Sequence, residues 1–186
     1  PALLEECPEL NAVCRGEGEE ALVELLDALR KSEGLGRSSR RSEPGKIADN
    51  GSNSPESEPL FTSIRNLDVR FRGKIYRNPL RPLITNLDAF PEDRETYFRR
   101  YPTLAGDSLL QYISSRGCPY PCAFCVNHEL NRIFKGLGPV QRRKSVGFAL
   151  RELKHFRTLY PHAETVFFID DLFLRDREWI REFLPR

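Results

Sequence analysis

The chain has 186 residues, of which 39% are hydrophobic and 30% charged, as is typical of a globular protein. Its 29 basic and 27 acidic residues give a formal net charge of +2, so the charge balance indicates no polyanionic partner such as nucleic acid. No window approaches the roughly 18 apolar residues that a membrane span requires. Five cysteines, an odd number, argue against a secreted disulfide framework, and we expect a cytoplasmic protein.

Residues 1–31 end in a pattern typical of a helix, with leucines and alanines at helical spacing. A short strand, "AVC", and a tight turn, "RGEG", precede this helix. We therefore predict the closing strand, loop and helix of an α/β domain. The sequence contains no Met and starts with "PALLEECPEL", so we expect a fragment of a longer polypeptide.

Residues 32–59 are rich in Ser, Gly, Pro, Arg and Glu and contain little that could be buried, which predicts a disordered linker. In residues 60–107, Val69 and Phe71 alternate with arginines before Gly73, a pattern that predicts a β-hairpin. The proline-containing run after the hairpin predicts an extended connector.

Residues 108–186 follow a strand–helix–strand pattern. Ser108–Ser114 is the first predicted strand, and Ser145 is expected to cap the helix that follows. Thr165–Asp170 is rich in β-branched and aromatic residues and predicts a buried strand. Another helix is expected from Asp176. We interpret "QRRKS", residues 141–145, as a solvent-exposed segment that leads into the helix capped by Ser145.

Cys118, Cys122 and Cys125 lie within eight residues directly after the first of these strands. Thiolates select zinc, copper(I) or iron–sulfur clusters. A four-iron cluster held by three cysteines keeps one iron free for a substrate or cofactor, which indicates chemistry rather than scaffolding. A zinc site that adds His128 as a fourth ligand is the alternative, and would make a non-catalytic zinc-binding module.

Asp170 and Asp171 come at the end of the second predicted strand. Because parallel strands present their carboxyl ends at one edge of a sheet, we expect these carboxylates to lie beside the cysteine loop. Successive strand residues point to opposite faces, so only one of the two should face a ligand there.

The stretch "CPYPCAFC" resembles the cysteine signature of the radical S-adenosylmethionine (SAM) enzymes, with Phe124 in its aromatic position. The resemblance implies that Cys118, Cys122 and Cys125 hold a [4Fe–4S] cluster and that the cluster cleaves SAM to a 5′-deoxyadenosyl radical. It also implies that Phe124 contributes to cofactor binding. One of Asp170 and Asp171 is then expected to face the amino group of SAM.

"FFIDDLF" and "AVCRGEGEEALVELLDAL" resemble parts of radical SAM proteins that carry a cobalamin-binding domain. This resemblance implies the tail of a Rossmann-like cobalamin-binding domain in residues 1–31. It implies the first βαβ units of a partial (β/α) TIM-type barrel in residues 108–186. The expected reaction is methyl transfer, cyclisation or rearrangement, with cobalamin as a further cofactor. A methylthiotransferase-like radical SAM enzyme without cobalamin is the nearer alternative.

The same resemblance implies an electron donor such as a flavodoxin or ferredoxin. It leaves the substrate open among small molecules, peptides and tRNA. The residues themselves indicate neither a membrane span nor a nucleic-acid surface.

Overall fold

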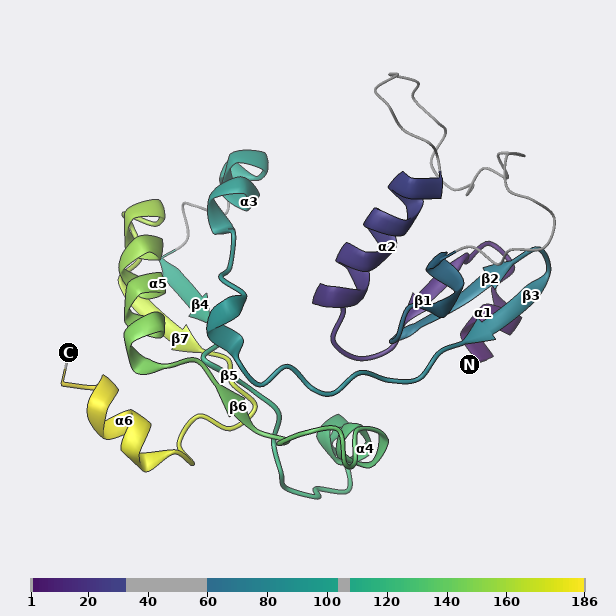
Figure 1. The fold of residues 1–186 in the computed structure, drawn as a ribbon. Coiled ribbons are helices and arrows are strands. Elements are labelled where there is room, and N and C mark those ends of the chain that lie inside the picture. Colours follow the sequence, from purple (N-terminus) through teal and green to yellow (C-terminus); the bar gives the residue numbers. More distant parts are fainter. Residues whose placement is uncertain (1, 33–59, 104–107, 186) are drawn as a thin grey trace. The chain divides into compact units, whose positions relative to one another are not determined.

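The computed structural model describes residues 2–32, 60–103 and 108–185, and the chain divides into two compact units, Pro1–Pro82 and Leu83–Arg186 (Figure 1). The elements of the first unit are α1 (Ala2–Glu6), β1 (Ala12–Cys14), α2 (Glu19–Ser32), η1 (Leu60–Ser63), β2 (Leu67–Phe71) and β3 (Lys74–Arg77). Those of the second are η2 (Leu87–Ala89), α3 (Arg94–Arg100), β4 (Leu109–Tyr112), β5 (Ser115–Arg116), α4 (Val126–Ile133), β6 (Arg142–Arg143), α5 (Val146–Leu159), β7 (Thr165–Phe168) and α6 (Arg177–Phe183). The predicted linker, apart from its first residue, lies outside the described residues, and the predicted boundaries after residues 31, 59 and 107 stay predictions.

An antiparallel sheet with the strand order β1-β2-β3 forms the centre of the first unit. The predicted hairpin is confirmed, because Phe71 pairs with Lys74 and only two residues form the turn between them. These two residues, Arg72 and Gly73, both have positive φ, at 49° and 76°. Two left-handed residues form the type I′ turn whose twist matches that of the flanking strands. The predicted strand "AVC" is β1, which pairs antiparallel with β2.

The helix predicted at the end of the first segment is α2, with acidic residues in its first turn and basic residues in its last turn. These charges complement the helix dipole. Of the apolar residues at helical spacing, Leu22 and Leu26 are 57% and 45% exposed, whereas Ala21 is fully buried. The core of this unit consists of Ala21, Ala28, Phe61, Ile64, Leu67 and Val69.

The strand–helix–strand pattern of the second unit is confirmed: β4 and β7 pair in parallel, and α5 lies between them in the sequence. The Ser145 hydroxyl caps α5 by accepting from the backbone N–H of Phe148 at 3.2 Å. The Asp176 carboxylate caps α6 by accepting from the N–H of Trp179 at 3.0 Å. Both are side chains that satisfy the free N–H groups of a first helical turn.

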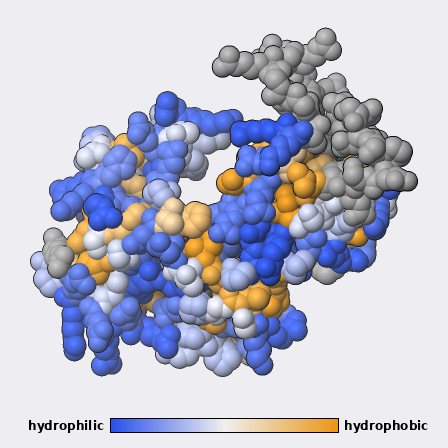
Figure 2. All heavy atoms as spheres, viewed as in Figure 1, coloured by the Kyte–Doolittle hydropathy of each residue, from blue (hydrophilic) through white to orange (hydrophobic). Residues whose placement is uncertain are grey.

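The two faces of the β4–β7 sheet differ. One face contributes to a core formed by Phe98, Leu110, Tyr112, Val146, Ala149, Phe156, Tyr160 and Trp179. The other face is open, and Leu109, Ile113, Phe167 and Ile169 on it are 40% to 53% exposed. The prediction that Thr165–Asp170 forms a buried strand is therefore wrong, because within the described residues β7 pairs with β4 alone. Figure 2 shows apolar patches that reach the surface between polar residues.

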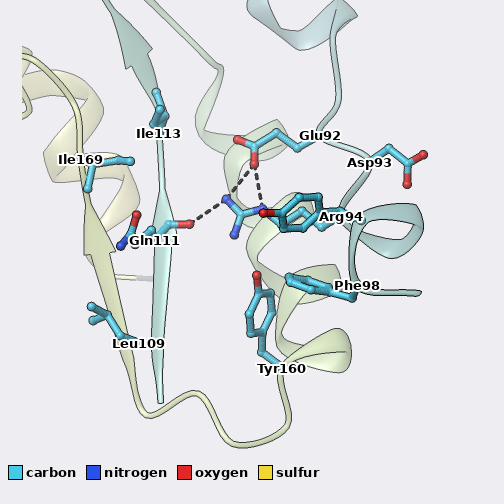
Figure 3. A pocket seen from close by; sticks show the side chains of 10 residues that line it. Glu92, Asp93, Arg94, Phe98, Leu109, Gln111, Ile113, Tyr160 and Ile169 are labelled. Atoms are coloured by element: carbon cyan, nitrogen blue, oxygen red, sulfur yellow. Dashed lines mark hydrogen bonds and ion pairs between the residues drawn. The ribbon is translucent and has the colours of Figure 1, made fainter. Parts of the chain in front are cut away.

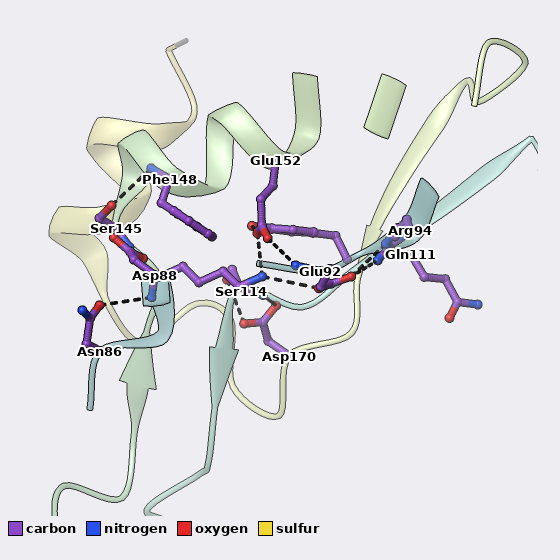
Figure 4. Close-up of polar contacts among 12 residues, drawn as sticks. Asn86, Asp88, Glu92, Arg94, Gln111, Ser114, Ser145, Phe148, Glu152 and Asp170 are labelled. Atoms are coloured by element: carbon purple, nitrogen blue, oxygen red, sulfur yellow. Dashed lines mark hydrogen bonds and ion pairs between the residues drawn. The ribbon is translucent and has the colours of Figure 1, made fainter. Parts of the chain in front are cut away.

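A buried polar network links three parts of the second unit (Figure 4). Lys144 and Glu152 are only 6% and 7% exposed, and their Nζ and Oε2 atoms lie 2.6 Å apart. The Tyr112 hydroxyl donates to the same Oε2 at 2.8 Å, and burial together with this carboxylate raises the pKa of Tyr112. The backbone N–H of Glu92 donates to Oε1 of Glu152 at 3.1 Å, so the segment before α3 is tied to α5.

The structure confirms a mixed α/β fold with small sheets, and the described residues form no closed barrel. The Rossmann-like tail and the partial barrel stay predictions. Among the described residues, no helix combines the length and the apolar character that crossing a membrane requires.

The buried network implies that removing the Lys144 ammonium group lowers the stability of the fold. We expect Lys144→Met to lower the free energy of unfolding by about 3–5 kcal/mol, because it leaves the buried Glu152 carboxylate without its partner. Urea titration followed by the fluorescence of Trp179, the one Trp of the chain, checks this, since its Nε1 donates to the Lys144 carbonyl at 2.8 Å. The control Lys154→Met, on the exposed side of α5, should change the value by less than about 0.5 kcal/mol. An equal effect of both variants would contradict a network specific to Lys144.

Candidate functional site

The carboxyl ends of β4 and β7 lie side by side, as expected for parallel neighbours. The segment from Ser114 to Gly117 leaves β4 at this edge, and Asp170 and Asp171 follow β7 there. Hydrogen bonds connect the two segments directly. The prediction that both carboxylates lie beside the start of the cysteine loop is confirmed.

Asp170 is directed back into the protein and joins the two strand ends. Its Oδ2 accepts from the N–H of Ser114 at 3.1 Å, and its Oδ1 accepts from the Ser114 hydroxyl at 2.8 Å (Figure 4). The Ser115 hydroxyl also donates to Oδ1. Ser114 and Ser115 are 0% and 3% exposed, so the carboxylate replaces the water that these buried groups have lost. Asp170 is therefore a positioning residue.

Asp171, unlike Asp170, faces solvent. It is exposed, and its Oδ2 accepts from the backbone N–H of Gly117 at 3.2 Å. An exposed carboxylate that is oriented by one main-chain N–H keeps acceptor capacity for a ligand. The expectation that the two neighbouring carboxylates serve different roles agrees with these contacts, and of the two it is Asp171 that is open to a ligand.

Gly117 is the residue at which the chain turns into the cysteine loop. Its φ is +81°, in the left-handed region that side chains disfavour. A Cβ at this position would also collide with the carbonyl oxygen of Val140. The loop can follow its path only because position 117 lacks a side chain.

Arg143 and Gln141 hold the segment after Asp171. The Arg143 guanidinium donates to the carbonyls of Leu172 and Phe173 at 3.2 and 2.8 Å, and Gln141 Nε2 donates to Leu172 at 3.1 Å. Arg143 also lies 4.7 Å from the centre of the Trp179 ring, and burial lowers its pKa. The interpretation of "QRRKS" as a solvated segment is thus wrong. Local sequence shows only a charged run, whereas these side chains find their partners on a segment about 30 residues later.

The three cysteines differ in their surroundings. Cys118 is buried, Cys125 is half-buried at the N-cap position of α4, and Cys122 is exposed. Phe124 is 94% exposed, and His128 is exposed in the first turn of α4.

Within the part of the chain that the structure describes, no group of three or more His, Cys, Asp or Glu side chains is arranged to hold a metal ion. Close spacing in the sequence therefore does not by itself give a metal site, and the three thiols differ in burial. The predicted metal ligands Cys118, Cys122 and Cys125 are therefore not assembled as a site. The zinc alternative with His128 gains no support from the described side chains either.

Comparison with known proteins gives one informative relative. The chain is 29% identical over 182 residues to an uncharacterized methyltransferase of Pyrococcus horikoshii. The aligned region covers 94% of this chain but only 31% of that protein, so the chain spans about a third of its relative. No family model matches the chain. No solved structure matches it either.

This relative corrects the functional prediction. It is named a methyltransferase, which is not a radical SAM assignment, so the prediction of a radical SAM enzyme is wrong. The methylthiotransferase-like alternative gains no support from it. Neither the relative nor the described side chains support a [4Fe–4S] cluster or cobalamin. The coarser prediction of an enzyme agrees with the name of the relative.

The conformation of Gly117 generates a prediction with a matched control. Gly136 has the same φ of +81°, but a Cβ added there would meet no described atom within 4 Å. We expect Gly136→Ala to cost about 1 kcal/mol of stability from backbone strain alone. Gly117→Ala should cost about 1–3 kcal/mol more, because the Val140 carbonyl must move.

The measurements are urea titration of both variants and the rate at which Cys118 reacts with a thiol reagent. Displacement of the loop should expose this buried thiol and accelerate its labelling in Gly117→Ala alone. Identical stabilities and labelling rates in the two variants would show that the contact with Val140 does not constrain the loop.

Proposed function

We propose that this chain is part of a SAM-dependent methyltransferase and that the carboxyl edge of β4 and β7 binds SAM. The name of the relative supports the reaction class, and most methyltransferases take their methyl group from SAM. Because the chain spans about a third of that relative, the activity of the whole protein belongs to this proposal.

The observation that carries the placement is the open carboxylate of Asp171. SAM has an α-ammonium group and a sulfonium, both cationic, so a carboxylate acceptor is the chemistry that it requires. Ligands of parallel α/β sheets collect outside the carboxyl ends of the strands, where Asp171 lies. The N–H of Gly117 orients Asp171, and Asp170 holds the strand ends together. The donor and acceptor set of this edge thus fits SAM.

SAM supplies an electrophilic methyl group on its sulfonium. A nucleophilic atom of the acceptor forms a bond to that carbon while the carbon–sulfur bond breaks and the sulfur keeps the electron pair. The acceptor atom then loses a proton. The residues of this chain bind and orient: Asp171 holds the ammonium group, and the N–H of Gly117 holds Asp171 in position.

Two finer predictions belong to the same proposal. We place the β4–α5–β7 unit at the edge of a larger parallel α/β sheet that continues on the β7 side, of the Rossmann-like or barrel type predicted from the sequence. Phe124, with 94% of its surface exposed, is proposed as a stacking partner for the adenine ring, since aromatic faces bind planar bases.

Calorimetric titration of the 186-residue chain with SAM tests the proposal. We expect Asp171→Asn to weaken SAM binding about tenfold or more, because it removes a charge-assisted hydrogen bond of roughly 1.5–3 kcal/mol. Its stability to urea should stay unchanged, since the Asp171 side chain is exposed. The matched control is Glu164→Gln, which removes an exposed carboxylate at the opposite end of β7 and should leave the affinity unchanged.

Asp170→Asn separates the positioning role from the ligand role. It turns an acceptor of two buried serines into a group with two donors, so we expect a loss of stability in urea as well as weaker SAM binding. No SAM binding by the wild-type chain at millimolar concentration would contradict the proposal. Equal, negligible effects of Asp171→Asn and Glu164→Gln would contradict the placement.

A further inference from the structure

The open edge of β4 borders a cleft of about 600 Å³ that the proposed SAM site does not use (Figure 3). The cleft lies between this edge and the segment that leads into α3. Leu109, Gln111 and Ile113, three alternating residues of the β4 segment, line it, together with Asp93, Arg94 and Tyr97. Its volume is within the range of ligand-binding pockets, roughly 300–1,000 Å³.

The hydrogen-bond pattern of β4 shows why these alternating residues matter. The Ser108 carbonyl accepts from the N–H of Thr165, and the Tyr112 carbonyl accepts from the N–H of Ile169. The N–H of Ser114 donates to the Asp170 carboxylate. Ser108, Tyr112 and Ser114 therefore all face β7. Within a strand, the N–H and C=O of one residue point to the same side, and those of the next residue point to the other. The backbone groups of Leu109, Gln111 and Ile113 therefore point away from β7, into the cleft.

One side chain already uses this edge. Arg94 Nη2 donates to the Gln111 carbonyl at 2.7 Å, and the same guanidinium is held by Glu92 and lies 4.3 Å from the centre of the Phe156 ring. Figure 3 shows Arg94 and Glu92 beside β4 at the level of Gln111. Because a carbonyl has two lone pairs, Gln111 can accept a second donor. Apart from this contact, the described residues place no partner on the outward N–H and C=O groups of residues 109, 111 and 113.

The walls of the cleft define the chemistry of its occupant. Tyr97, which is 51% exposed, lines the cleft together with Phe98 and Tyr160, so the wall facing the strand is aromatic. The Asp93 carboxylate is exposed, and the N–H of Thr96 lowers its pKa, so it is ionised at neutral pH. Glu92, by contrast, already contacts Arg94 and Lys144. The cleft thus offers unpaired strand groups, an aromatic wall and a negative charge.

We propose that this cleft binds an extended, basic peptide segment of a partner protein, which adds to the sheet as a strand beside β4. Main-chain hydrogen bonds to residues 109, 111 and 113 provide the pairing, as in other cases of strand addition. The aromatic wall takes alternate side chains of the peptide, and Asp93 pairs with a Lys or Arg. Peptide binding here involves the β4 edge and the walls of the cleft and does not depend on SAM binding.

The probe is a synthetic six-residue peptide, acetyl-Thr-Lys-Val-Lys-Val-Thr-amide. At saturation we expect the amides of Leu109, Gln111 and Ile113 to exchange with solvent at least tenfold more slowly, as measured by NMR without SAM. Two further peptides carry N-methyl groups on one or the other alternate set of residues. Only the set that faces β4 donates to it, so one methylated peptide should bind and the other should not.

Variants of the chain test the same edge from the protein side. Gln111→Pro removes an outward N–H and keeps the pairing with β7, since proline is tolerated on an edge strand. We expect it to weaken peptide binding about tenfold, whereas Gln111→Ala, which keeps the N–H, should not. Ile113→Pro is the second variant, and the fluorescence of Trp179 verifies that each variant is folded. Asp93→Asn keeps a good N-cap and should weaken binding about two- to fivefold.

Three results would overturn the proposal. The first is the absence of protection at residues 109, 111 and 113 with millimolar peptide. The second is equal binding of both methylated peptides, which would show that the main chain is not recognised. The third is protection that appears without peptide and increases with protein concentration, which would assign the edge to a second copy of the chain. SAM binding is measured separately, so failure here leaves the proposed function untouched.

Discussion

The link between Asp170 and the serines after β4 is the constraint on which the candidate site depends. One carboxylate satisfies a backbone N–H and two hydroxyls that are almost completely buried. Without it, these groups would lose their hydrogen bonds to water and gain nothing in return. The link fixes the ends of two strands that are more than 50 residues apart in the chain. It thereby fixes the start of the cysteine loop and the position of Asp171.

The buried network around Glu152 fixes a second part of this unit, on the face of the β4–β7 sheet that α5 covers. Lys144, Tyr112 and the N–H of Glu92 all meet this carboxylate, so α5, β4 and the segment before α3 are held in one arrangement. A buried ion pair adds little net stability, because removing two charges from water costs nearly as much as their attraction returns. Its value here is geometric: it keeps the segment with Glu92 and Arg94 beside the open edge of β4, and so shapes the cleft.

The proposed function rests on the exposed carboxylate of Asp171. The strongest sequence motif, the three closely spaced cysteines, forms no metal site among the described residues. Three cysteines within eight residues indicated a metal cluster, yet they end in buried, half-buried and exposed positions. Ligation requires that side chains converge, and convergence depends on the path of the loop rather than on spacing. The carboxylates after β7 depend less on such detail, because the edge of a parallel sheet collects whatever follows its strands. The name of the relative supports a methyltransferase, and the SAM site at this edge is our proposal.

The sequence by itself determined the local elements of this protein. The Gly73 hairpin, the Ser145 and Asp176 helix starts and the parallel strand–helix–strand unit were all predictable, because turns and caps depend on neighbours within a few residues. The tertiary structure alone decided which side chains are buried and which are available. Arg143 and Lys144 belong to a charged run that looks solvated, but both find partners on distant segments. Asp170 and Asp171 are identical in sequence terms, and they differ because neighbouring residues of an extended chain point in opposite directions, one toward buried donors and the other toward solvent.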